Sequence, residues 1–448
     1  MRISVLGTGY LGATHAAALA CWGHDVVGVD VEPHRVEQLA RGEAPFHEPG
    51  FAELLGDGVR SGRLHFTTDP AAVEQAEVHF LCVGTPQRRG EDGADLAALW
   101  TAVETLAPRL QPGSLVVGKS TVPVGTAALV QQHLDEATRA GGRRGEVAWN
   151  PEFLREAHAV EDSLRPDRLV FGVASDAAEA RLRDVYCHPI ADGVAVVRTD
   201  LQTAELAKAS ANVMLASRIS VVNVLAEVCE AAEADVEGLT RILGLDPRIG
   251  PLYLSPGIGF GGGCLPKDLR AFVSRAAELG VDSASLLLGA VDDVNGHQRQ
   301  RAVEAATALL DGRPRGRRVA ALGASFKAGS DDVRDSPALA VAGALAELGA
   351  HVRVYDPQAL RHLAGQSDLE VCHDVQSACE GAELTLVLTE WPEFAALDPA
   401  AVGRVVARRV VLDGRLVLDP EAWTRAGWTV MALGRGEAEP DPAARKAG

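Results

Sequence analysis

Three glycines near the start of the chain constrain its fold more than any other feature. Gly7, Gly9 and Gly12 follow an apolar run that ends at Leu6, and they open an Ala-rich stretch typical of a helix. The next apolar run ends on Asp30. A glycine backbone can approach a pyrophosphate closely, and the N-terminus of a helix favours the negative charge of that group. The spacing therefore predicts a β-α-β unit that binds a dinucleotide.

Asp30 indicates which dinucleotide is bound. A carboxylate at the end of the second strand can accept hydrogen bonds from both hydroxyls of a ribose, and it would repel a 2′-phosphate. The sequence therefore favours NAD over NADP, although the nearby Arg35 tempers that preference. The simpler alternative is a tight turn in a domain without a cofactor. The strand, the helix and the acid around the glycines argue against it.

Two regions of the chain alternate strand-like runs with Ala-rich helical segments, the pattern of a parallel sheet covered by helices. The second run of each region ends on an acid, Asp30 and Asp356. We therefore predict an α/β fold with two Rossmann-like, doubly wound domains, the second without the glycine pattern. The predicted strands are 3–6, 26–29, 78–83 and 115–117 in the first region, and 319–322, 351–355, 384–388 and 410–412 in the second.

A long helix is expected to join the two regions. No Gly or Pro interrupts the chain between Gly193 and Gly238, and the segment 201–234 is rich in Ala and Leu. It would form one helix of roughly 50 Å at about 1.5 Å per residue. So long a helix needs partners on more than one face, and we interpret it as a spine and a dimerisation element. The segment 311–318, rich in helix breakers, predicts a domain boundary.

Composition and charge argue against several classes of protein. The formal charge of −18 disfavours nucleic acid as a partner, because the chain as a whole repels polyanions. No apolar stretch is expected to span a membrane, and the first residues leave no room for a signal peptide, so we expect a cytoplasmic protein. The seven cysteines are scattered and never spaced as CxxC. This suggests neither a disulfide framework nor a metal site, and six of the cysteines are expected to lie in cores.

Cys264 is the exception because of its neighbours. It follows three glycines at 261–263 and precedes Pro266, a residue favoured in the first turn of a helix. A thiol at a helix N-terminus beside Lys267 should ionise more readily, and Asp268 is close enough to manage a proton or a water. The alternative is that the glycines only form a turn and the thiol is buried.

The long helix carries a polar face. Glu205, Lys208 and Asn212 lie three and four residues apart, so they share one side of it. A lysine and an amide presented together can polarise a carbonyl or hold an oxyanion. Taken alone, the three residues are more simply interpreted as a solvated stripe.

A short acidic helix is expected at 150–156. Asn150 is a suitable N-cap, and the proline after it suits the first helical position. Such a helix would place Glu152 and Glu156 one turn apart on a common face, where they could position a water or a hydroxyl. Compensation of the helix dipole is the alternative explanation.

These segments together resemble the UDP-glucose/GDP-mannose dehydrogenase family, from Ile3 to about Leu433. The resemblance and the patterns above predict an NAD-binding domain at 1–198, a helical dimerisation domain with Cys264 at 199–312, and a nucleotide-sugar domain at 313–435. A disordered tail is expected at 436–448. The motifs that carry the resemblance are GTGYLG at 7–12 with Asp30, FLCVGTP at 80–86, KSTVPVGT at 119–126, NPEFLRE at 150–156, the helix 205–223, GFGGGCLPKD at 259–268 and FKAGSDDVRDSP at 326–337.

The resemblance implies a four-electron oxidation. The C6 alcohol of a nucleotide-sugar is oxidised to an aldehyde with NAD, and the cysteine captures the aldehyde. The resulting thiohemiacetal is oxidised to a thioester, which water hydrolyses. Covalent capture keeps the reactive aldehyde from escaping. Carried over by motif, the nucleophile is Cys264, the oxyanion is stabilised by Lys208 and Asn212, and protons and the hydrolytic water are handled by Asp268, Thr121, Glu152 and Glu156.

The resemblance also implies binding residues. Those for NAD are Gly7, Gly9, Tyr10, Leu11, Gly12, Asp30, Arg35, Thr85, Thr121, Glu156, Lys267 and Arg334. Those for the nucleotide-sugar are Glu152, Phe153, Leu154, Lys208, Asn212, Arg248, Tyr253, Gly261, Phe326, Lys327 and Arg415. In this family Arg248 would reach the substrate of the partner subunit, which would make a homodimer, or a higher homo-oligomer, functional.

The chain departs from the family pattern at two positions. Gly263 stands where a serine usually precedes the cysteine, and Ala157 stands where a glycine usually follows the acid of the NPEFLRE motif. Neither change removes a reacting group. Ala157 requires a backbone conformation that tolerates a side chain.

The segments 165–168 and 246–250 are more similar to family members that oxidise UDP-glucose than to those that act on GDP-mannose or UDP-N-acetylhexosamines. UDP-glucose is therefore the expected substrate. A two-electron β-hydroxyacid dehydrogenase is an alternative of another reaction class, and it gives no reason for Cys264. A redox-sensing NAD-binding module without turnover is the non-enzymatic alternative.

Overall fold

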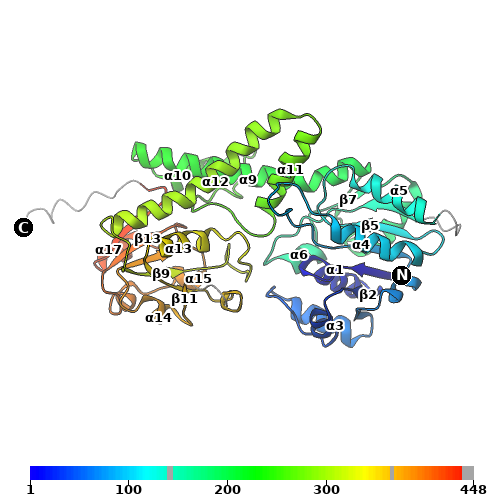
Figure 1. The fold of residues 1–448 in the computed structure, drawn as a ribbon, viewed down its shortest axis with the longest axis horizontal. Helices are drawn as coiled ribbons and strands as arrows, with labels where there is room; N and C mark the ends of the chain where they lie inside the picture. Colours follow the sequence, from blue (N-terminus) through cyan, green and yellow to red (C-terminus); the bar gives the residue numbers. More distant parts are fainter. Residues whose placement is uncertain (139–144, 364–367, 436–448) are drawn as a thin grey trace, which may run out of the picture. The chain divides into compact units, whose positions relative to one another are not determined.

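The computed structural model describes residues 1–138, 145–363 and 368–435 and divides the chain into two compact units. The first unit contains Met1–Asn212 and Arg270–Val281, and the second contains Val213–Leu269 and the residues from Asp282 on (Figure 1). Two helices, α9 (Leu201–Ala232) and α11 (Leu265–Glu278), contribute residues to both units. The predicted tail at 436–448 lies outside the described residues.

The first unit is built on an eight-stranded sheet in the order β3-β2-β1-β4-β5-β6-β7-β8. Neighbouring strands are parallel except β6 and β7. Both faces are covered: Val5 lies in one core with α1 and α3, and its neighbour Leu6 lies in another with α4 and α5. The elements are β1 (Arg2–Leu6), α1 (Tyr10–Cys21), β2 (Asp25–Val29), α2 (Pro33–Ala40), α3 (Phe51–Arg60), β3 (Leu64–Thr67), β4 (Val78–Leu81), α4 (Ala97–Leu106), β5 (Leu115–Gly118), α5 (Thr126–Thr138), β6 (Glu146–Trp149), α6 (Ala159–Leu164), β7 (Arg168–Gly172), α7 (Asp176–Val185), α8 (Cys187–Ala191) and β8 (Ala195–Thr199).

The second unit contains a six-stranded parallel sheet in the order β11-β10-β9-β12-β13-β14. Val319 packs in the core beneath α12 and α13, and the next residue, Ala320, packs with Trp391 and Trp423 on the other face. The elements are α10 (Val236–Leu245), α12 (Asp282–Leu309), β9 (Arg318–Leu322), α13 (Pro337–Glu347), β10 (His351–Tyr355), β11 (Glu370–Val371), α14 (Val375–Cys379), β12 (Leu384–Val387), α15 (Pro392–Ala395), α16 (Pro399–Val402), β13 (Val410–Asp413), α17 (Pro420–Arg425) and β14 (Thr429–Ala432).

The predicted doubling of the α/β architecture is confirmed by the strand orders. The third, second, first, fourth, fifth and sixth strands of each unit are neighbours in that order. The acids at the ends of the second strands are equivalent, because Asp30 accepts a hydrogen bond from the amide of Thr8 and Asp356 accepts one from the amide of Ala324. Asp356 is fully buried and also bound by the indole of Trp391, so it is a structural residue.

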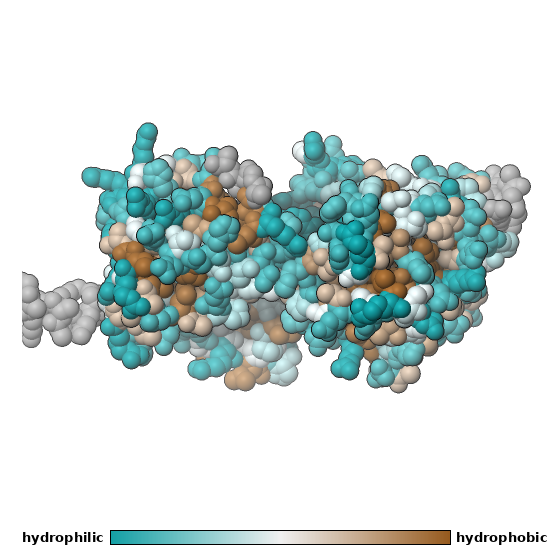
Figure 2. Space-filling view, turned by 90° about the horizontal axis from the view of Figure 1, so that it is seen from below, coloured by the Kyte–Doolittle hydropathy of each residue, from teal (hydrophilic) through white to brown (hydrophobic). Residues whose placement is uncertain are grey.

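The predicted long helix is confirmed as α9, which begins after Asp200 and ends before Glu233, a residue with a φ of +54°. Its length and composition alone would suffice to cross a membrane, contrary to our expectation that no segment would do so. The core helix of a soluble protein can have the same length and composition. In α9, 44% of the apolar window is buried. Hydrophilic side chains predominate on the face shown in Figure 2, and hydrophobic ones gather there in small patches.

Candidate active site

The glycine loop of the first unit leaves an open cradle at the N-terminus of α1. Gly7 has a φ of +87°, and a Cβ there would lie 2.9 Å from Cα of Val83. A Cβ on Gly12 would lie 1.8 Å from the carbonyl oxygen of Gly7, so the turn closes only without side chains. Within the described part of the chain, and apart from Gly9's own neighbours and helix backbone, no atom lies within 4 Å of the Cβ position of Gly9. The loop therefore fits the pyrophosphate of a dinucleotide in front of the helix.

Asp30 is buried at the end of β2, beside the glycine loop. Its carboxylate accepts hydrogen bonds from the amides of Thr8 at 2.6 Å and Glu32 at 3.0 Å, and it pairs with Arg35 at 3.1 Å. Burial raises the pKa of Asp30, but the two amides and the guanidinium outweigh it, so the pKa is lowered. The carboxylate therefore stays ionised, and Arg35 lies where the sequence places it, close to the acid.

Thr85 and Thr121 follow the carboxyl ends of the adjacent strands β4 and β5. The hydroxyl of Thr85 donates a hydrogen bond of 2.7 Å to the carbonyl of Thr121. Thr85 is buried, and Thr121 is partly exposed. In an open parallel sheet, ligands bind outside these strand ends, so the two predicted cofactor residues lie at a suitable edge.

The predicted helix at 150–156 is wrong. The segment has no helical residues, and α6 begins only at Ala159. The side chain of Asn150 does not cap a helix, because its oxygen accepts hydrogen bonds from Nζ of Lys119 at 3.0 Å and the phenol of Tyr186 at 2.5 Å. Its amide nitrogen donates to the carbonyl of Val170. The side-chain oxygen that would cap a helix is instead bound by residues that are distant in the chain.

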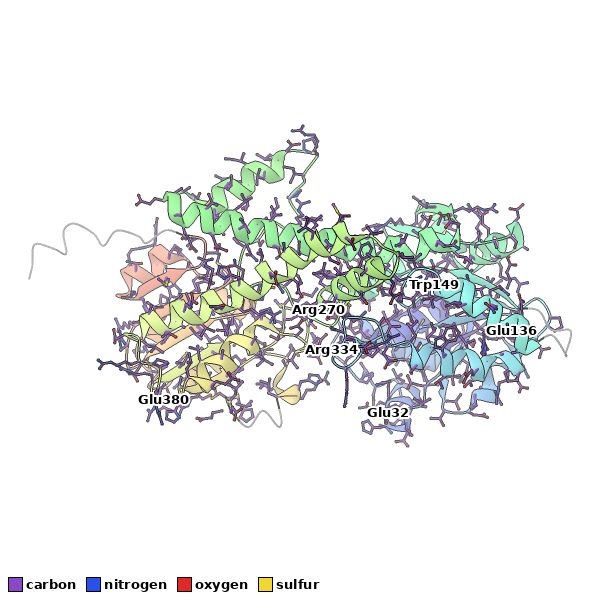
Figure 3. All side chains as sticks on the ribbon, turned by 45° about the horizontal axis from the view of Figure 1, so that its top comes forward. Glu32, Glu136, Trp149, Arg270, Arg334 and Glu380 are labelled. Carbon is purple, nitrogen blue, oxygen red and sulfur yellow. The ribbon has the colours of Figure 1, made fainter. Side chains whose placement is uncertain are left out.

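Trp149 fixes the point at which the segment 150–156 begins. It ends β6 beside Gly118 of β5, and a Cβ on Gly118 would lie 2.2 Å from the indole ring. The absence of a side chain at Gly118 therefore makes room for the buried ring, which is labelled in Figure 3. Burying so large an aromatic ring fixes the point at which the loop leaves the sheet.

Ala157 adopts the left-handed conformation that its glycine-like position requires. Its φ is +67°, and its amide donates a hydrogen bond of 3.2 Å to the phenol oxygen of Tyr10. Tyr10 in turn donates to Glu48. The expectation of a backbone conformation that readily tolerates a side chain at Ala157 is wrong, because a positive φ favours glycine. The contact also ties the first turn of α1 to the loop that follows Glu156.

Glu152 and Lys208 form a buried ion pair. Oε1 of Glu152 lies 3.0 Å from Nζ of Lys208, and the side chains are 12% and 6% exposed. The other oxygen of Glu152 accepts a hydrogen bond of 2.6 Å from the amide of Leu154. The ring of Phe153 lies between two cations, 3.8 Å from the guanidinium of Arg168 and 6.0 Å from Nζ of Lys208. The structure therefore brings these predicted catalytic and substrate residues together.

The polar face of α9 is not a solvated stripe, because Glu205, Lys208 and Asn212 are all buried. Glu205 caps α5: its oxygens accept hydrogen bonds from the amides of Gly125 at 2.7 Å and Ala127 at 2.6 Å. Burial raises the pKa of Glu205 in spite of these amides. The sequence did not predict this contact of the Glu205 carboxylate, since the amides that donate to it lie about 80 residues away in the chain.

In the second unit, Cys264 lies directly before α11. The residue is exposed, so the alternative of a buried thiol is wrong. Its carbonyl accepts the first bond of the helix, from the amide of Asp268 at 3.0 Å. Lys267 pairs with the buried carboxylate of Asp268. A thiol at a helix N-terminus next to a lysine is in the setting that favours thiolate.

All seven cysteines are free, but the expectation that six would lie in cores is only partly right. Cys82, Cys229, Cys372 and Cys379 are buried. Cys21 ends α1 and Cys187 begins α8, and both are exposed because helix ends project from the packed layers.

The three glycines before Cys264 pack against a segment that follows β9. A Cβ on Gly261 would lie 2.2 Å from the carbonyl oxygen of Asp335, and a Cβ on Gly263 would lie 2.3 Å from the guanidinium carbon of Arg334. The amide of Gly262 donates to the carbonyl of Arg334 at 3.0 Å. Arg334, labelled in Figure 3, therefore occupies the space of a side chain at Gly263. The serine usual at this position would displace it.

Arg415 binds three segments of the second unit through their backbone carbonyls. Its guanidinium donates to the carbonyls of Leu388 at 3.0 Å, Gly259 at 3.2 Å and Phe326 at 3.4 Å. Nζ of Lys327 lies 5.6 Å from the ring of Phe326. Gly261, Phe326, Lys327 and Arg415 thus lie around the segment that carries the cysteine.

Two residues of α12 hold this segment and were missed by the sequence analysis. Asn295 accepts a hydrogen bond of 2.7 Å from the amide of Phe260 and donates one of 3.0 Å to its carbonyl. Arg299 donates to the same carbonyl at 2.9 Å and pairs with Asp335. The available signal was a polar pair four residues apart on a helix that also carries apolar residues such as Leu288 and Val291.

Some predicted residues are not gathered with the others. Arg248 is 87% exposed and pairs with Asp246. Tyr253 is partly exposed, with a φ of +60°. The first unit holds Gly7, Gly9, Tyr10, Leu11, Gly12, Asp30, Arg35, Thr85, Thr121, Glu152, Phe153, Leu154, Glu156, Lys208 and Asn212; the second holds Arg248, Tyr253, Gly261, Cys264, Lys267, Asp268, Phe326, Lys327, Arg334 and Arg415.

Known proteins share this sequence and fold along the whole chain. Domain models of the UDP-glucose/GDP-mannose dehydrogenase family match residues 1–190 (NAD binding domain), 202–297 (central domain) and 320–420 (UDP binding domain). The UDP-glucose 6-dehydrogenase of Rhizobium meliloti (strain 1021) is 37% identical over 439 residues, which cover 97% of this chain and 100% of that protein.

Solved structures agree with these matches. A UDP-glucose dehydrogenase from the hyperthermophilic archaeon Pyrobaculum islandicum has a TM-score of 0.89 and 37% identity, with coverage of 97% of this chain and 98% of that one. A UDP-D-ManNAc dehydrogenase from Pyrococcus horikoshii has a TM-score of 0.87 and 28% identity, with coverage of 98% and 100%. The chain belongs to the UDP-glucose/GDP-mannose dehydrogenase family and is an NAD-dependent oxidoreductase.

Proposed function

We propose that this protein oxidises UDP-glucose to UDP-glucuronate, with Cys264 as a covalent nucleophile. The observation that carries the proposal is the exposed thiol at the N-terminus of α11, beside Lys267 and Asp268. A two-electron dehydrogenase of an alcohol has no use for a nucleophile in this setting. A four-electron oxidation needs one, because the intermediate aldehyde must be held for the second step.

The choice of UDP-glucose is supported by the names of the relatives. Those at 37% identity over nearly the whole chain are called UDP-glucose dehydrogenases. A UDP-N-acetylhexosamine is the second candidate, because the Pyrococcus horikoshii protein with this fold is named for UDP-D-ManNAc. The chemistry at C6 would be the same for both sugars, so the two candidates differ in substrate but not in mechanism.

In the first half of the proposed reaction the C6 alcohol loses a hydride and a proton and becomes an aldehyde. NAD, which the glycine loop and Asp30 would hold, would supply the hydride acceptor, one molecule for each of the two oxidations. The thiolate of Cys264 then forms a carbon–sulfur bond to C6, and the carbonyl oxygen takes a proton to complete a thiohemiacetal. We assign Lys208 and Asn212 to stabilising the oxyanion that precedes this protonation.

In the second half the thiohemiacetal loses a hydride and a proton and becomes a thioester. Water attacks its carbonyl, the carbon–sulfur bond breaks, and the carboxylate and the thiolate of Cys264 are released with two protons. We assign Asp268, Thr121, Glu152 and Glu156 to moving these protons and holding the water.

We further propose that the protein acts as a homodimer in the cytoplasm. Met214, Val221 and Val228 recur every seven residues on α9, and each is more than half exposed in the single chain. Ile242 and Leu245 of α10 are also exposed. A regular apolar stripe of this kind fits a second copy of the same helix. Replacing Val221 and Val228 with aspartate should shift the protein to monomers in sedimentation experiments.

The test of the proposed reaction is its stoichiometry. Wild type should form two NADH for each UDP-glucose consumed, and UDP-N-acetylglucosamine and GDP-mannose should be run beside it. Cys264→Ser should abolish steady-state turnover, whereas Cys187→Ser, a second exposed thiol, should leave it unchanged. One NADH per sugar, or full turnover without the thiol, would reject the covalent mechanism. Activity on another nucleotide-sugar alone would reject the substrate but keep the mechanism.

Two other functions give different results in the same experiment. A two-electron β-hydroxyacid dehydrogenase would turn over a small hydroxyacid and ignore Cys264. A redox-sensing NAD-binding module would turn over no nucleotide-sugar. The buried pair of Glu152 and Lys208 has no purpose in a sensor, which favours the enzyme.

A further inference from the structure

Lysine is rare in this chain, and this makes each lysine informative. Five of the 43 basic Lys and Arg residues are lysines: Lys119, Lys208, Lys267, Lys327 and Lys446. A guanidinium is larger than an ammonium and does not lose its proton in proteins, so a position that needs a compact or ionisable cation cannot use arginine. Lys208, Lys267 and Lys327 have roles in the proposed reaction, and Lys446 lies outside the described residues. Lys119 has no role so far.

Lys119 lies beneath the segment that carries Glu152. It follows β5 and is 7% exposed. Its Nζ lies 3.0 Å from the side-chain oxygen of Asn150 and 3.3 Å from the phenol of Tyr186, and 5.7 Å from the centre of that ring. A buried ammonium is costly unless it is bound by several such groups, so the surrounding network is built around it.

The network leads directly to Glu152. Asn150 is held on both sides, by Lys119 and by the carbonyl of Val170, and only Pro151 separates it from Glu152. Lys119 and Glu152 also line the same cavity of the first unit. The ammonium attracts the carboxylate across it. Glu152 therefore interacts with two cations, with Lys208 in direct contact and with Lys119 through electrostatic attraction.

We propose that Lys119 is a positioning residue whose ammonium fixes Asn150 and holds the ionised carboxylate of Glu152 on Lys208. Lys119 touches neither substrate nor cofactor in this proposal and acts through Glu152. The inference rests on the proposed function, which gives Glu152 a part in proton transfer.

The surroundings of Lys119 identify it as the group that titrates. Burial lowers its pKa to about 8, against a smaller raising effect of Cys82 and Glu152. Burial also raises the pKa of Cys82 to about 12, raises that of Tyr186 well above its usual value, and lowers that of His15 well below its own. Those three neighbours are neutral at pH 7 to 8, so Lys119 is the group among them that gains or loses a charge in this range.

Loss of the proton from Lys119 should therefore lower kcat above about pH 8. The test is Lys119→Met, which keeps the length of the side chain and removes its charge. Asn150 keeps a partner in this variant, because Tyr186 donates to the same oxygen at 2.5 Å. We expect kcat at pH 7 to fall by about tenfold with KM for NAD unchanged, and the decline of kcat above about pH 8 to disappear.

A double-mutant cycle separates positioning from a general structural effect. If Lys119 acts through Glu152, adding Lys119→Met to Glu152→Gln should change kcat by less than about twofold. Full additivity of the two losses would overturn the proposal. The matched control is Tyr186→Phe, which removes the phenol but leaves the contact of Lys119 with Asn150, and which should keep the alkaline decline.

The unfolding temperature of Lys119→Met distinguishes a positioning lysine from a lysine that only supports the fold. The folded state holds the proton of Lys119 less well than the unfolded state, so the buried charge costs stability at neutral pH and less as the pH rises above about 8. Lys119→Met should therefore unfold at the same or a higher temperature at pH 7 while losing activity. A lower unfolding temperature with an unchanged pH profile of kcat would assign Lys119 to the fold alone.

The titration itself can be measured without turnover. Protein labelled with ¹³C at the ε carbon of its five lysines should show one signal that titrates near pH 8, and Lys119→Met should remove that signal. A titration at the usual value near 10.5 would overturn the proposal even if the enzyme is active. If no nucleotide-sugar is turned over, the proposed function fails separately, and this experiment still decides the state of Lys119.

Discussion

Nζ of Lys208 lies 3.0 Å from Oε1 of Glu152, and both side chains are largely removed from water. An ion pair in this position is a poor source of stability, because desolvation of the two charges offsets much of their attraction. It does hold a carboxylate and an ammonium at one place beside Phe153 and Leu154. The pair is therefore better explained by chemistry than by folding.

Breaking the pair on one side should cost both activity and stability. Lys208→Met leaves the carboxylate of Glu152 buried without its cation, and we expect a loss of about 3 kcal/mol in the free energy of unfolding. We expect kcat to fall by about a hundredfold or more, since the proposed oxyanion donor is lost. Urea unfolding and steady-state kinetics measure the two effects. Adding Glu152→Gln should restore most of the stability but none of the activity, and a double variant as unstable as Lys208→Met would contradict this account.

Ala157 should be improved by the glycine that is usual at its position. A residue with a side chain at a φ of +67° is strained by roughly 1–2 kcal/mol, and glycine relieves this at a smaller entropic cost. Ala157→Gly should therefore raise the free energy of unfolding by about 0.5–1 kcal/mol. The control is Ala159→Gly, a buried helical position, which should lower it by about 1 kcal/mol. Equal effects of the two variants would show that the backbone at Ala157 is not strained.

Gly263 should influence the cofactor through Arg334. A side chain at Gly263 would meet the guanidinium at 2.3 Å, so Gly263→Ser must move it away from its pairing with Asp332. If Arg334 binds NAD as the family resemblance implies, the variant should change KM for NAD by a few-fold with little effect on KM for the nucleotide-sugar. The same substitution in an Arg334→Ala background should then have no effect on KM for NAD. An unchanged effect in that background would disconnect the two residues.

Strands and the long helix were predictable because their signals are local. The runs that form β2 and β9 are apolar over most consecutive residues because both faces of the sheets are covered. The absence of Gly and Pro sufficed for α9. The order of the strands was not predicted, because the right-handed crossover rule fixes the hand of each connection but not which strands become neighbours.

The residues of the candidate site could be proposed from the sequence, but their contacts could not. Asn150 looked like a helix cap, yet its partners Lys119 and Tyr186 lie more than 30 residues away in the chain and cancel that local preference. Glu205 and Lys208 looked solvated because burial on a helix is decided by whatever packs against it. Asn295 and Arg299 could not be linked to the cysteine segment without knowing which loop lies beside α12.

His79 should make the first unit sensitive to acid. It lies in β4 with Nδ1 2.8 Å from the hydroxyl of Ser4, and its Nε2 is buried without a hydrogen-bond partner among the residues that the structure describes. Burial lowers its pKa to about 4 from 6.5. The unfolded chain therefore takes up a proton near pH 6.5 that the folded chain refuses until about pH 4. The contribution of neutral His79 to the free energy of unfolding is fully present above pH 6.5 and is lost as the pH falls from 6.5 to about 4.

The size of this effect follows from the shift, which corresponds to roughly 3 kcal/mol at pH 4. Replacing the buried pair with Ser4→Ala and His79→Leu together leaves no unpaired polar group, so the double variant should lose less stability than wild type between pH 6.5 and 4. Unfolding in urea at several pH values measures the difference. The single variant His79→Leu serves as the control, because it should flatten the same window while leaving the hydroxyl of Ser4 without its partner and lowering stability at pH 7. A double variant that loses stability in acid as steeply as wild type would show that other groups, and not His79, set the acid limit.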